Sequence, residues 1–332
     1  MPLNRSYIIS ATVATLALLF DNSAAEAASC ELKLVASIPA TLSASNQLLA
    51  DAVINDQPVK IAVDTGAEVS VLSKKFVDRM GIPLQENRAV FYGLTNRGIS
   101  NQIHIDKIRL GNAVSTNALF VAAPIGGDGT DDASVGLLGS DYLQNYDVEI
   151  DIADGKINLF TQDHCPGKLV YWAPEFFKSN IYYTGLTPAH RPMLDVLVDG
   201  QKLRALLDTG ASMTTMRMAV AKNQFGLTPD TSELKRVGQT IGVEARAIGA
   251  YSHDFKSMTF GDITLHNPDI LVSPIDSGEH VIGTGSHIKS DRLNAEDLLI
   301  GMNFMKKFRL VIAYSENALY YTVAAPKQAA SQ

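Results

Sequence analysis

The chain contains an internal duplication, and this feature limits the folds open to it more than any other. Residues 60–72 read KIAVDTGAEVSVL, and residues 204–216 read RALLDTGASMTTM. Both segments consist of an apolar run, an Asp-Thr-Gly-Ala turn and a second apolar run. A matching pair of segments at such a spacing indicates two copies of one structural unit.

The flanks of the two motifs match as well. Asp51 and Asp195 stand at the same distance before the two turns, and we interpret both as strand or turn residues rather than as catalytic groups. After the turns, LLGSDYLQNYDVEI at 137–150 aligns without a gap on LIGMNFMKKFRLVI at 299–312. The starts also look alike, with CELKLV from Cys30 and CPGKLV from Cys165. Matching flanks on both sides make a chance resemblance of two turns a poor explanation.

Each half is predicted to be a mostly β unit with one or two short helices. A length of 332 residues suits two domains of ordinary size, and 46% apolar residues are enough for two cores. Runs of apolar and β-branched residues, several of them alternating with polar ones, are typical of half-buried strands. The predicted strands include 48–54, 59–64, 102–110, 147–152, 156–160, 193–198, 204–208, 308–314 and 318–323, and the predicted helices lie at 73–82, 140–146 and 218–227.

The N-terminus has the pattern of a secretory signal peptide over residues 1–27. Arg5 precedes an apolar stretch at 8–20, and AEA follows at 25–27 as a cleavage site. As a membrane anchor the stretch is short, and no later segment is predicted to cross a membrane. We therefore expect a secreted or periplasmic protein; lipid attachment at Cys30 is an alternative. The predicted lobes are 28–164 and 165–325, and 326–332 is predicted to be a flexible tail.

The two cysteines are informative if the protein is exported. An exported chain meets an oxidising compartment, and Cys30 with Cys165 is the one intramolecular pairing that two cysteines allow. Their matching places in the two halves suggest that a twofold arrangement brings them together. Two free thiols are the alternative, because sequence does not show the geometry that a disulfide needs.

The chemistry that the duplicated turn permits depends on its carboxylate. In each turn the Gly supplies a permissive backbone and the Thr hydroxyl can bond to neighbouring backbone. Two such turns facing each other would bring Asp64 and Asp208 together. Two carboxyl groups at this distance share a proton and titrate in separated steps. One can then accept a proton from water while the other donates to a carbonyl oxygen.

On these motifs the chain resembles the aspartic proteases of the retropepsin-like and pepsin-like superfamily. The resemblance rests on VDTGA at 63–67, LDTGA at 207–211 and the apolar-apolar-Gly segments at 137–141 and 299–303. It implies a mainly β fold of two acid-protease-like β-barrel lobes with an active-site cleft between them, a peptide or protein substrate, and no cofactor. With both lobes in one chain, we expect an active monomer. The implied residues are the catalytic Asp64 and Asp208, the turn residues Thr65, Gly66, Ala67, Thr209, Gly210 and Ala211, and the supporting Leu138, Gly139, Ile300 and Gly301.

The family also closes a β-hairpin flap over its peptide. The corresponding region here is 90–100, with Tyr92 and Gly93 as candidates for the tip, although Tyr92 could be an ordinary strand aromatic. The Gly-rich segment 237–249 is a candidate second flap. Ser70 and Ser212 follow the two turns, and we expect them to cap the next segment or face solvent rather than bond to the carboxylates.

Other kinds of chemistry lack their sequence signatures. The net charge of −7 gives no reason to expect a nucleic-acid partner. The chain has no zinc-protease or serine-hydrolase motif, and the acidic run at 128–132 misses the calcium-loop spacing, so no metal is expected. Two alternatives stay open. One is a catalytically silent peptide-binding module on the same fold, and the other is a glycosidase that uses two carboxylates.

Overall fold

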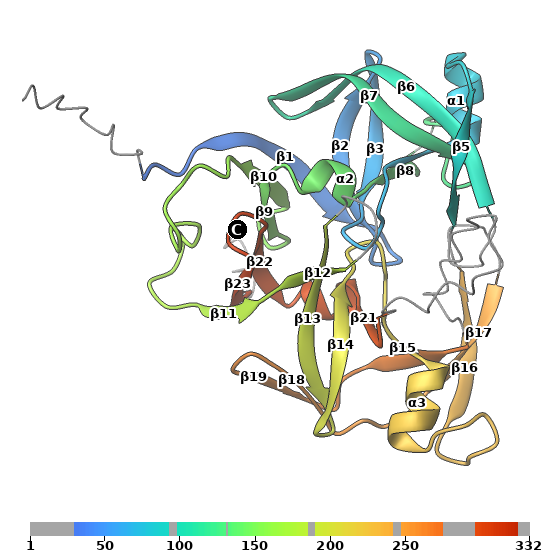
Figure 1. Ribbon diagram of the computed structural model, residues 1–332, viewed down its shortest axis with the longest axis vertical. Coiled ribbons are helices and arrows are strands. Elements are labelled where there is room, and N and C mark those ends of the chain that lie inside the picture. The colour runs from blue at the N-terminus through green and yellow to red at the C-terminus, as the bar shows by residue number, and fades with distance from the viewer. Residues whose placement is uncertain are drawn as a thin grey trace, which may run out of the picture.

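The computed structural model describes residues 30–92, 98–130, 132–184, 190–241, 247–274 and 296–324. The predicted signal peptide and tail lie outside these residues, as does most of the polar loop at 274–297. The described part is mainly β, as predicted, and forms two barrel-like lobes (Figure 1). None of its helices is long and apolar enough to cross a membrane.

The first lobe is a closed six-stranded barrel. Each strand of the barrel is hydrogen-bonded to the next, and the ladder between β2 and β6 closes the ring. A hairpin of β5 with β6 extends from the barrel. The six barrel strands are β2 (Leu48–Ile54), β3 (Gln57–Val63), β8 (Ser134–Leu138), β4 (Val71–Ser73), β7 (Ala113–Ala123) and β6 (Gly98–Leu110), and the hairpin adds β5 (Gln85–Tyr92).

The second lobe repeats this order with its barrel left open. Strand β6 of the first lobe corresponds to two shorter strands of the second lobe, β17 and β18, and strand β7 corresponds to β19 and β20. In each case the chain leaves the extended conformation between the two shorter strands. The sequence did not predict this opening. The strands are β12 (Tyr182–Thr184), β13 (Arg191–Val198), β14 (Gln201–Leu207), β15 (Thr214–Arg217), β16 (Lys235–Ile241), β17 (Ala247–Ser252), β18 (Ser257–Phe260), β19 (Ile263–His266), β20 (Ile270–Ser273) and β21 (Leu298–Ile300).

A six-stranded antiparallel sheet joins the two lobes. Three strands come from each half, and the β9–β22 ladder crosses between them with Val311 opposite Glu149. β1 then continues from this sheet into the first barrel by pairing with β2. The sheet order is β11 (Phe177–Asn180), β23 (Ala318–Val323), β22 (Phe308–Ala313), β9 (Asp147–Asp151), β10 (Lys156–Phe160) and β1 (Leu34–Leu42).

Four short helices complete the described fold: α1 (Lys74–Met80), α2 (Ser140–Leu143), α3 (Met218–Phe225) and α4 (Met302–Met305). α1 and α3 end at Gly81 and Gly226, whose φ angles of 64° and 70° favour glycine. The predicted helices correspond to α1, α2 and α3, whereas α4 was missed although it is the counterpart of α2.

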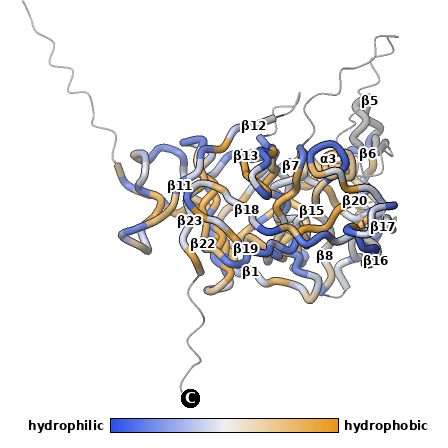
Figure 2. The backbone as a smooth tube through the Cα atoms, turned by 90° about the horizontal axis from the view of Figure 1, so that it is seen from below, coloured by the Kyte–Doolittle hydropathy of each residue, from blue (hydrophilic) through white to orange (hydrophobic). Residues whose placement is uncertain are grey.

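One hydrophobic cluster runs through both lobes and the joining sheet. It includes Ile61 of the first lobe, Leu207 of the second and Ile150 of the sheet, all almost fully buried. The hydrophobic stretches in Figure 2 run along strands such as β15 and β20. Because the core is continuous, the two lobes pack as one body and hold the loops between them in place.

The structure corrects one part of the sequence repeat. β1 pairs with β10 and β2, and the corresponding pairs in the second half are made by β11 with β23 and β12 with β13. β11 begins only at Phe177, so Cys165 is not the structural counterpart of Cys30. The likeness of CELKLV and CPGKLV is therefore not part of the structural duplication.

Candidate active site

The two Asp-Thr-Gly turns have the same internal geometry. Asp64 follows β3 and Asp208 follows β14, and each main-chain N–H donates to the apolar-apolar-Gly segment, at Leu138 O and Ile300 O, over 3.0 Å. Within each turn the carboxylate Oδ1 accepts two amides. These amides belong to Gly66 and Ala67 (3.0 and 2.9 Å) and to Gly210 and Ala211 (2.9 and 3.1 Å). Each carboxylate is thereby fixed by its own turn.

The turns face each other, so that the two carboxyl groups meet. Asp64 and Asp208 are hydrogen-bonded side chain to side chain. Each carboxyl lies against the glycine of the opposite turn. A Cβ added at Gly66 would lie 2.6 Å from Asp208 Oδ1, and one added at Gly210 would lie 2.6 Å from Asp64 Oδ1. Glycine is required at both positions by this close approach rather than by an unusual φ angle.

Thr65 and Thr209 lock the turns together across the lobes. Thr65 Oγ1 donates to Leu207 O over 2.6 Å, and Thr209 Oγ1 donates to Val63 O over 2.7 Å. Each hydroxyl also accepts the other threonine's amide, at 3.0 and 3.1 Å. Both threonines are fully buried. Four reciprocal bonds between the lobes therefore set the distance between the two carboxyl groups.

The apolar-apolar-Gly segments pass behind the turns. Ser140 N donates to Ala67 O, and Met302 N donates to Ala211 O, both over 2.8 Å. A Cβ at Gly139 would lie 2.7 Å from the carbonyl carbon of Val69. The glycines let the two backbones approach, and the resulting bonds support the two Asp-Thr-Gly turns from beneath.

A pair of polar residues missed by sequence analysis ties each turn to its supporting segment. Ser70 donates from Oγ to Asp141 Oδ1 (2.7 Å) and from N to Oδ2 (2.9 Å), and it accepts Gly139 N. Thr214 makes the same bonds to Asn303 and Gly301. The expectation that Ser70 caps a segment or faces solvent is wrong, since it is buried. Its counterpart is Thr214 rather than Ser212. The sequence signal for these bonds was a polar residue six positions after Asp64 and after Asp208. It was matched by an Asp or Asn two positions after the Gly of each apolar-apolar-Gly segment.

The surroundings raise the pKa of both carboxyl groups. Burial raises the pKa of Asp64, while the hydrogen bond from Asp208, the turn amides and the charge of Arg191 act against the rise. The pKa of Asp208 is raised well above its usual range by burial, and the negative charge of Asp64 raises it further. A proton is therefore retained on the pair far above the pH at which a free aspartate loses it.

An ion pair between the lobes lies close to the first turn. Arg191 begins β13, and its Nε lies 3.6 Å from Oε1 of Glu68, the residue after Ala67. The Arg191 side chain is only 10% exposed, and its Nε makes no hydrogen bond. Sequence analysis did not single out either residue.

Each lobe contributes one hairpin on the same side of the molecule, β5–β6 from the first and β16–β17 from the second (Figure 1). These are the regions predicted as flaps. Tyr92 is the last residue of β5, opposite Gly98. Gly93 lies outside the described residues, so its place as a flap tip stays a prediction.

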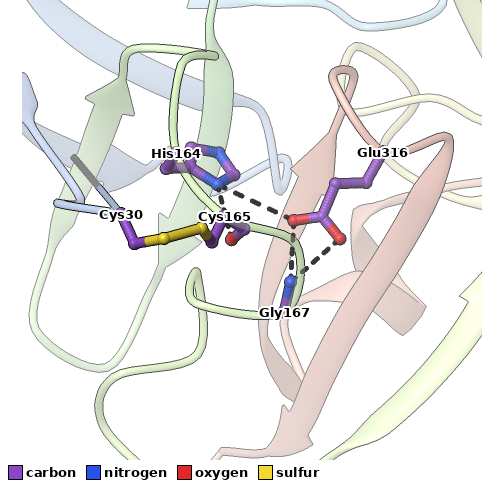
Figure 3. The surroundings of a disulfide bond; sticks show 5 residues. All are labelled: Cys30, His164, Cys165, Gly167 and Glu316. Atoms are coloured by element: carbon purple, nitrogen blue, oxygen red, sulfur yellow. Dashed lines mark hydrogen bonds and ion pairs between the residues drawn. A yellow bond between two sulfur atoms is a disulfide. The ribbon is translucent and has the colours of Figure 1, made fainter. Parts of the chain in front are cut away.

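Cys30 and Cys165 form a disulfide with a Cα–Cα distance of 4.8 Å (Figure 3). The two cysteines meet because of local strand pairing rather than a twofold arrangement of the two halves. β1 and β10 run antiparallel with Leu34 opposite Phe160, and continuing this register brings Cys30 opposite the residues around Cys165. The bond extends the β1–β10 ladder and fixes the start of the segment that leads into the second lobe.

Next to the disulfide lies a buried ionic cluster that joins both lobes (Figure 3). His164 Nε2 is 2.6 Å from Asp147 Oδ2, and its Nδ1 is 3.1 Å from Cys165 O and 3.8 Å from Glu316 Oε1. Burial acts to lower the pKa of His164, but the hydrogen bonds to Asp147 and Cys165 O and the charges of Asp147 and Glu316 raise it overall, which favours the imidazolium. Glu316 also accepts Gly167 N at 3.1 Å.

The remaining polar candidates have structural surroundings. Asp51 lies in β2 and pairs with Lys60, and Asp195 lies in β13 and pairs with Lys202 at 2.7 Å. Both are thus strand residues with lysine partners. Among the described residues, no group of His, Cys, Asp and Glu is arranged to hold a metal ion.

The comparisons with known proteins agree with this geometry. Residues 50–145 match the family model described as "gag-polyprotein putative aspartyl protease", and residues 194–304 match the model described as "Aspartyl protease". No curated protein sequence matches the chain significantly. The chain therefore carries two aspartyl protease family domains in tandem, and these domains support a function of the protease type.

Proposed function

We propose that this protein is an exported aspartic endopeptidase that hydrolyses peptide bonds with water activated between Asp64 and Asp208. The observation that carries the proposal is the pair of hydrogen-bonded carboxyl groups on facing turns. A pair that keeps one proton can accept a proton from water on one side and donate to the amide carbonyl on the other. The reaction needs no cofactor and no covalent intermediate.

The rest of the site supports the same chemistry. The threonine bonds hold the carboxyl groups in a fixed arrangement, which reduces the reorganisation needed during reaction. The two hairpins on one side are suited to close over an extended peptide. Because both catalytic turns belong to one chain, we propose that the protein acts as a monomer. The disulfide supports export, since such bonds persist in oxidising compartments.

A glycosidase is disfavoured by the carboxyl geometry. Such enzymes hold their two carboxyl groups about 5–9.5 Å apart, to leave room for a sugar or a water. Here the two groups are in direct hydrogen-bond contact. No sugar can enter between them as that mechanism requires.

The test is a digest of a mixed peptide library by the mature chain starting at Ala28, read by mass spectrometry from pH 3 to 8. Asp64→Asn and Asp208→Asn proteins serve as matched controls. We expect internal cleavage that is strongest at acid pH and is lost in both variants. Cleavage that persists in either variant would refute the two-aspartate mechanism. A folded protein that binds library peptides without cutting them would establish a peptide-binding module instead.

A further inference from the structure

The segment that leads from β10 to β11 lies on the outer face of the joining sheet. Residues 161–176, which we call the strap, contain no helix or strand and pass the sheet as a wide loop (Figure 1). Neighbouring side chains of a strand point to opposite faces. In β22, Ile312 belongs to the main core, whereas Val311 packs in a second cluster with Leu169 of the strap. The strap therefore covers an apolar patch on the side of the sheet away from the main core.

Two anchors made by side chains hold the strap in place. The aromatic anchor is Trp172, whose Nε1 donates to Thr322 Oγ1 over 3.0 Å and whose ring centroid lies 4.3 Å from Cζ of Arg309. Neither contact changes its charge near neutral pH, since arginine stays protonated. The polar anchor is His164 with Gly167, and its histidine can titrate in that range.

His164 is enclosed at the polar anchor between the two halves of the chain (Figure 3). Its side chain is fully buried, as is that of Asp147, the first residue of β9. The ring nitrogens face Asp147 Oδ2 at 2.6 Å on one side, and Cys165 O at 3.1 Å with Glu316 Oε1 at 3.8 Å on the other. A doubly protonated imidazole donates from both nitrogens, whereas a neutral ring has one N–H and gives up one of these sides. Loss of the proton also leaves two buried carboxylates without this cation.

We propose that His164 is a pH-sensitive latch: its protonated ring fastens the strap to β9 and to the β22–β23 turn, and loss of the proton frees residues 166–176. The disulfide keeps Cys165 next to Cys30 in either state, so the strap opens without detaching. The inference goes beyond the proposed function and does not depend on it. Because the strap covers the sheet that joins the lobes, the latch makes this cover complete at acid pH and loose at alkaline pH.

The two carboxylates keep hydrogen-bond donors of their own when the strap opens. Asp147 accepts Ser315 N at 2.9 Å and Ser315 Oγ at 2.5 Å. Glu316 accepts the Tyr320 hydroxyl at 2.5 Å. Both carboxylates therefore stay bound to their own side of the contact, and the strap is the part that is released. The titratable or charged groups around the latch are Asp147 of β9, Glu316 of the turn, Tyr320 of β23, Tyr183 of β12, and Asp163 of the strap with its partner Lys33.

The pKa of His164 sets the direction of the switch. Burial of the ring lowers this pKa, but the hydrogen bonds to Asp147 and Cys165 O and the charges of Asp147 and Glu316 raise it overall. The latch is therefore complete below the ordinary value of about 6.5 and is lost as pH rises through the higher pKa of the closed strap.

The chain contains a single tryptophan, Trp172, so its fluorescence reports directly on the strap. The test is acrylamide quenching of the wild-type protein, with its disulfide intact, from pH 5 to about 9.5, below the ordinary pKa of tyrosine. Far-UV circular dichroism is recorded alongside. We expect quenching to rise with a midpoint above about pH 6.5 while the circular dichroism spectrum is unchanged. Hydrogen-exchange protection factors of residues 164–172 should fall by about tenfold or more over the same range, because a charged hydrogen bond is lost.

Three results with the wild type would overturn the latch. The first is quenching that does not change with pH. The second is a midpoint at or below about 6.5, because the carboxylates would then not favour the charged ring. The third is loss of the circular dichroism signal in step with the quenching, because the whole protein would then unfold and the strap would not open by itself.

Three variants assign the transition to His164. His164→Gln cannot carry the charge, so its quenching should match the open strap already at pH 5 and show no transition; a retained transition would refute the role of this ring. Glu316→Gln removes one carboxylate but keeps an oxygen that accepts Gly167 N, and its midpoint should move to lower pH. If His164→Gln folds poorly, Glu316→Gln decides, since an unmoved midpoint contradicts the latch. His266→Gln changes an exposed histidine of β19 and should keep the wild-type transition; loss of the transition there would refute the assignment.

Discussion

Replacement of Thr209 by Val tests how the two lobes hold the two Asp-Thr-Gly turns together. Valine has nearly the same shape as threonine but lacks the hydroxyl, so packing is preserved while two hydrogen bonds are lost. The first leaves Val63 O without its 2.7 Å donor, and the second leaves Thr65 N without its 3.0 Å acceptor. Both groups belong to almost fully buried residues.

The expected magnitude follows from those two groups. Leaving a buried donor or acceptor unsatisfied costs about 1–3 kcal/mol, so the variant should lose roughly 2–6 kcal/mol of its free energy of unfolding. This is a large part of the 5–15 kcal/mol typical of a folded protein. Urea denaturation followed by fluorescence and circular dichroism, with linear extrapolation, measures the difference.

Thr209→Ser is the matched control, because it keeps the hydroxyl and removes only a methyl group. It should retain most of the stability that Thr209→Val loses. A difference of about 0.5 kcal/mol is the size expected for an ordinary surface change. If the free energy of unfolding of the Val variant lies within that difference of the wild-type value, the reciprocal threonine bonds do not stabilise the junction of the lobes, and the reasoning is wrong.

Three other outcomes are expected. Gly66→Ala should abolish peptide cleavage with little change in the circular dichroism spectrum, because the new Cβ overlaps the Asp208 carboxyl; retained activity would contradict the facing geometry. At His164, burial favours the neutral ring, but the hydrogen bonds to Asp147 and Cys165 O and the charges of Asp147 and Glu316 together outweigh it, so the pKa is raised. The stabilisation is therefore complete below the unfolded value of about 6.5 and is lost as pH rises through the folded pKa. The urea midpoint of the wild type should then exceed that of His164→Gln at pH 5, with the gap closing at alkaline pH; a constant gap would refute the charged ring. Replacing Cys30 and Cys165 together by Ser should lower the free energy of unfolding by about 2–5 kcal/mol, seen as a lower urea midpoint, and an unchanged midpoint would show that the bond adds no stability.

The facing arrangement of the two Asp-Thr-Gly turns could be predicted because the information for each turn is local and duplicated. Asp64 and Asp208 each lie in a short motif, and the repeat by itself implies that the motifs face each other. The same repeat also held a signal for the hydrogen bonds of Ser70 to Asp141 and of Thr214 to Asn303. Ser70 aligns with Thr214 and Asp141 aligns with Asn303, so both aligned positions are polar. Reading the alignment for polar matches, in addition to apolar ones, would have found them.

Other features depend on contacts that the sequence does not encode locally. The pairing of Arg191 with Glu68 joins opposite lobes and has no counterpart in the repeat, so alignment of the halves cannot show it. The opening of the second barrel results from a break between β17 and β18 within what is one strand in the first lobe. The sequence suggested the disulfide from a twofold arrangement of the two halves, whereas the structure explains it by the register of β1 and β10.

The ladder between β9 and β22 has a consequence for the order of events during synthesis. β9 belongs to the first half, but its outer edge is covered only by residues 308–313, near the end of the chain. An uncovered strand edge readily pairs with other chains. Until the last strands emerge, the nascent chain presents this edge without its partner, and the second catalytic turn has no support from residues 299–303. The proposed hydrolytic capacity would therefore arise only after residues 299–313 have emerged, which delays it past the stage at which the preceding chain could be cut by its own turns.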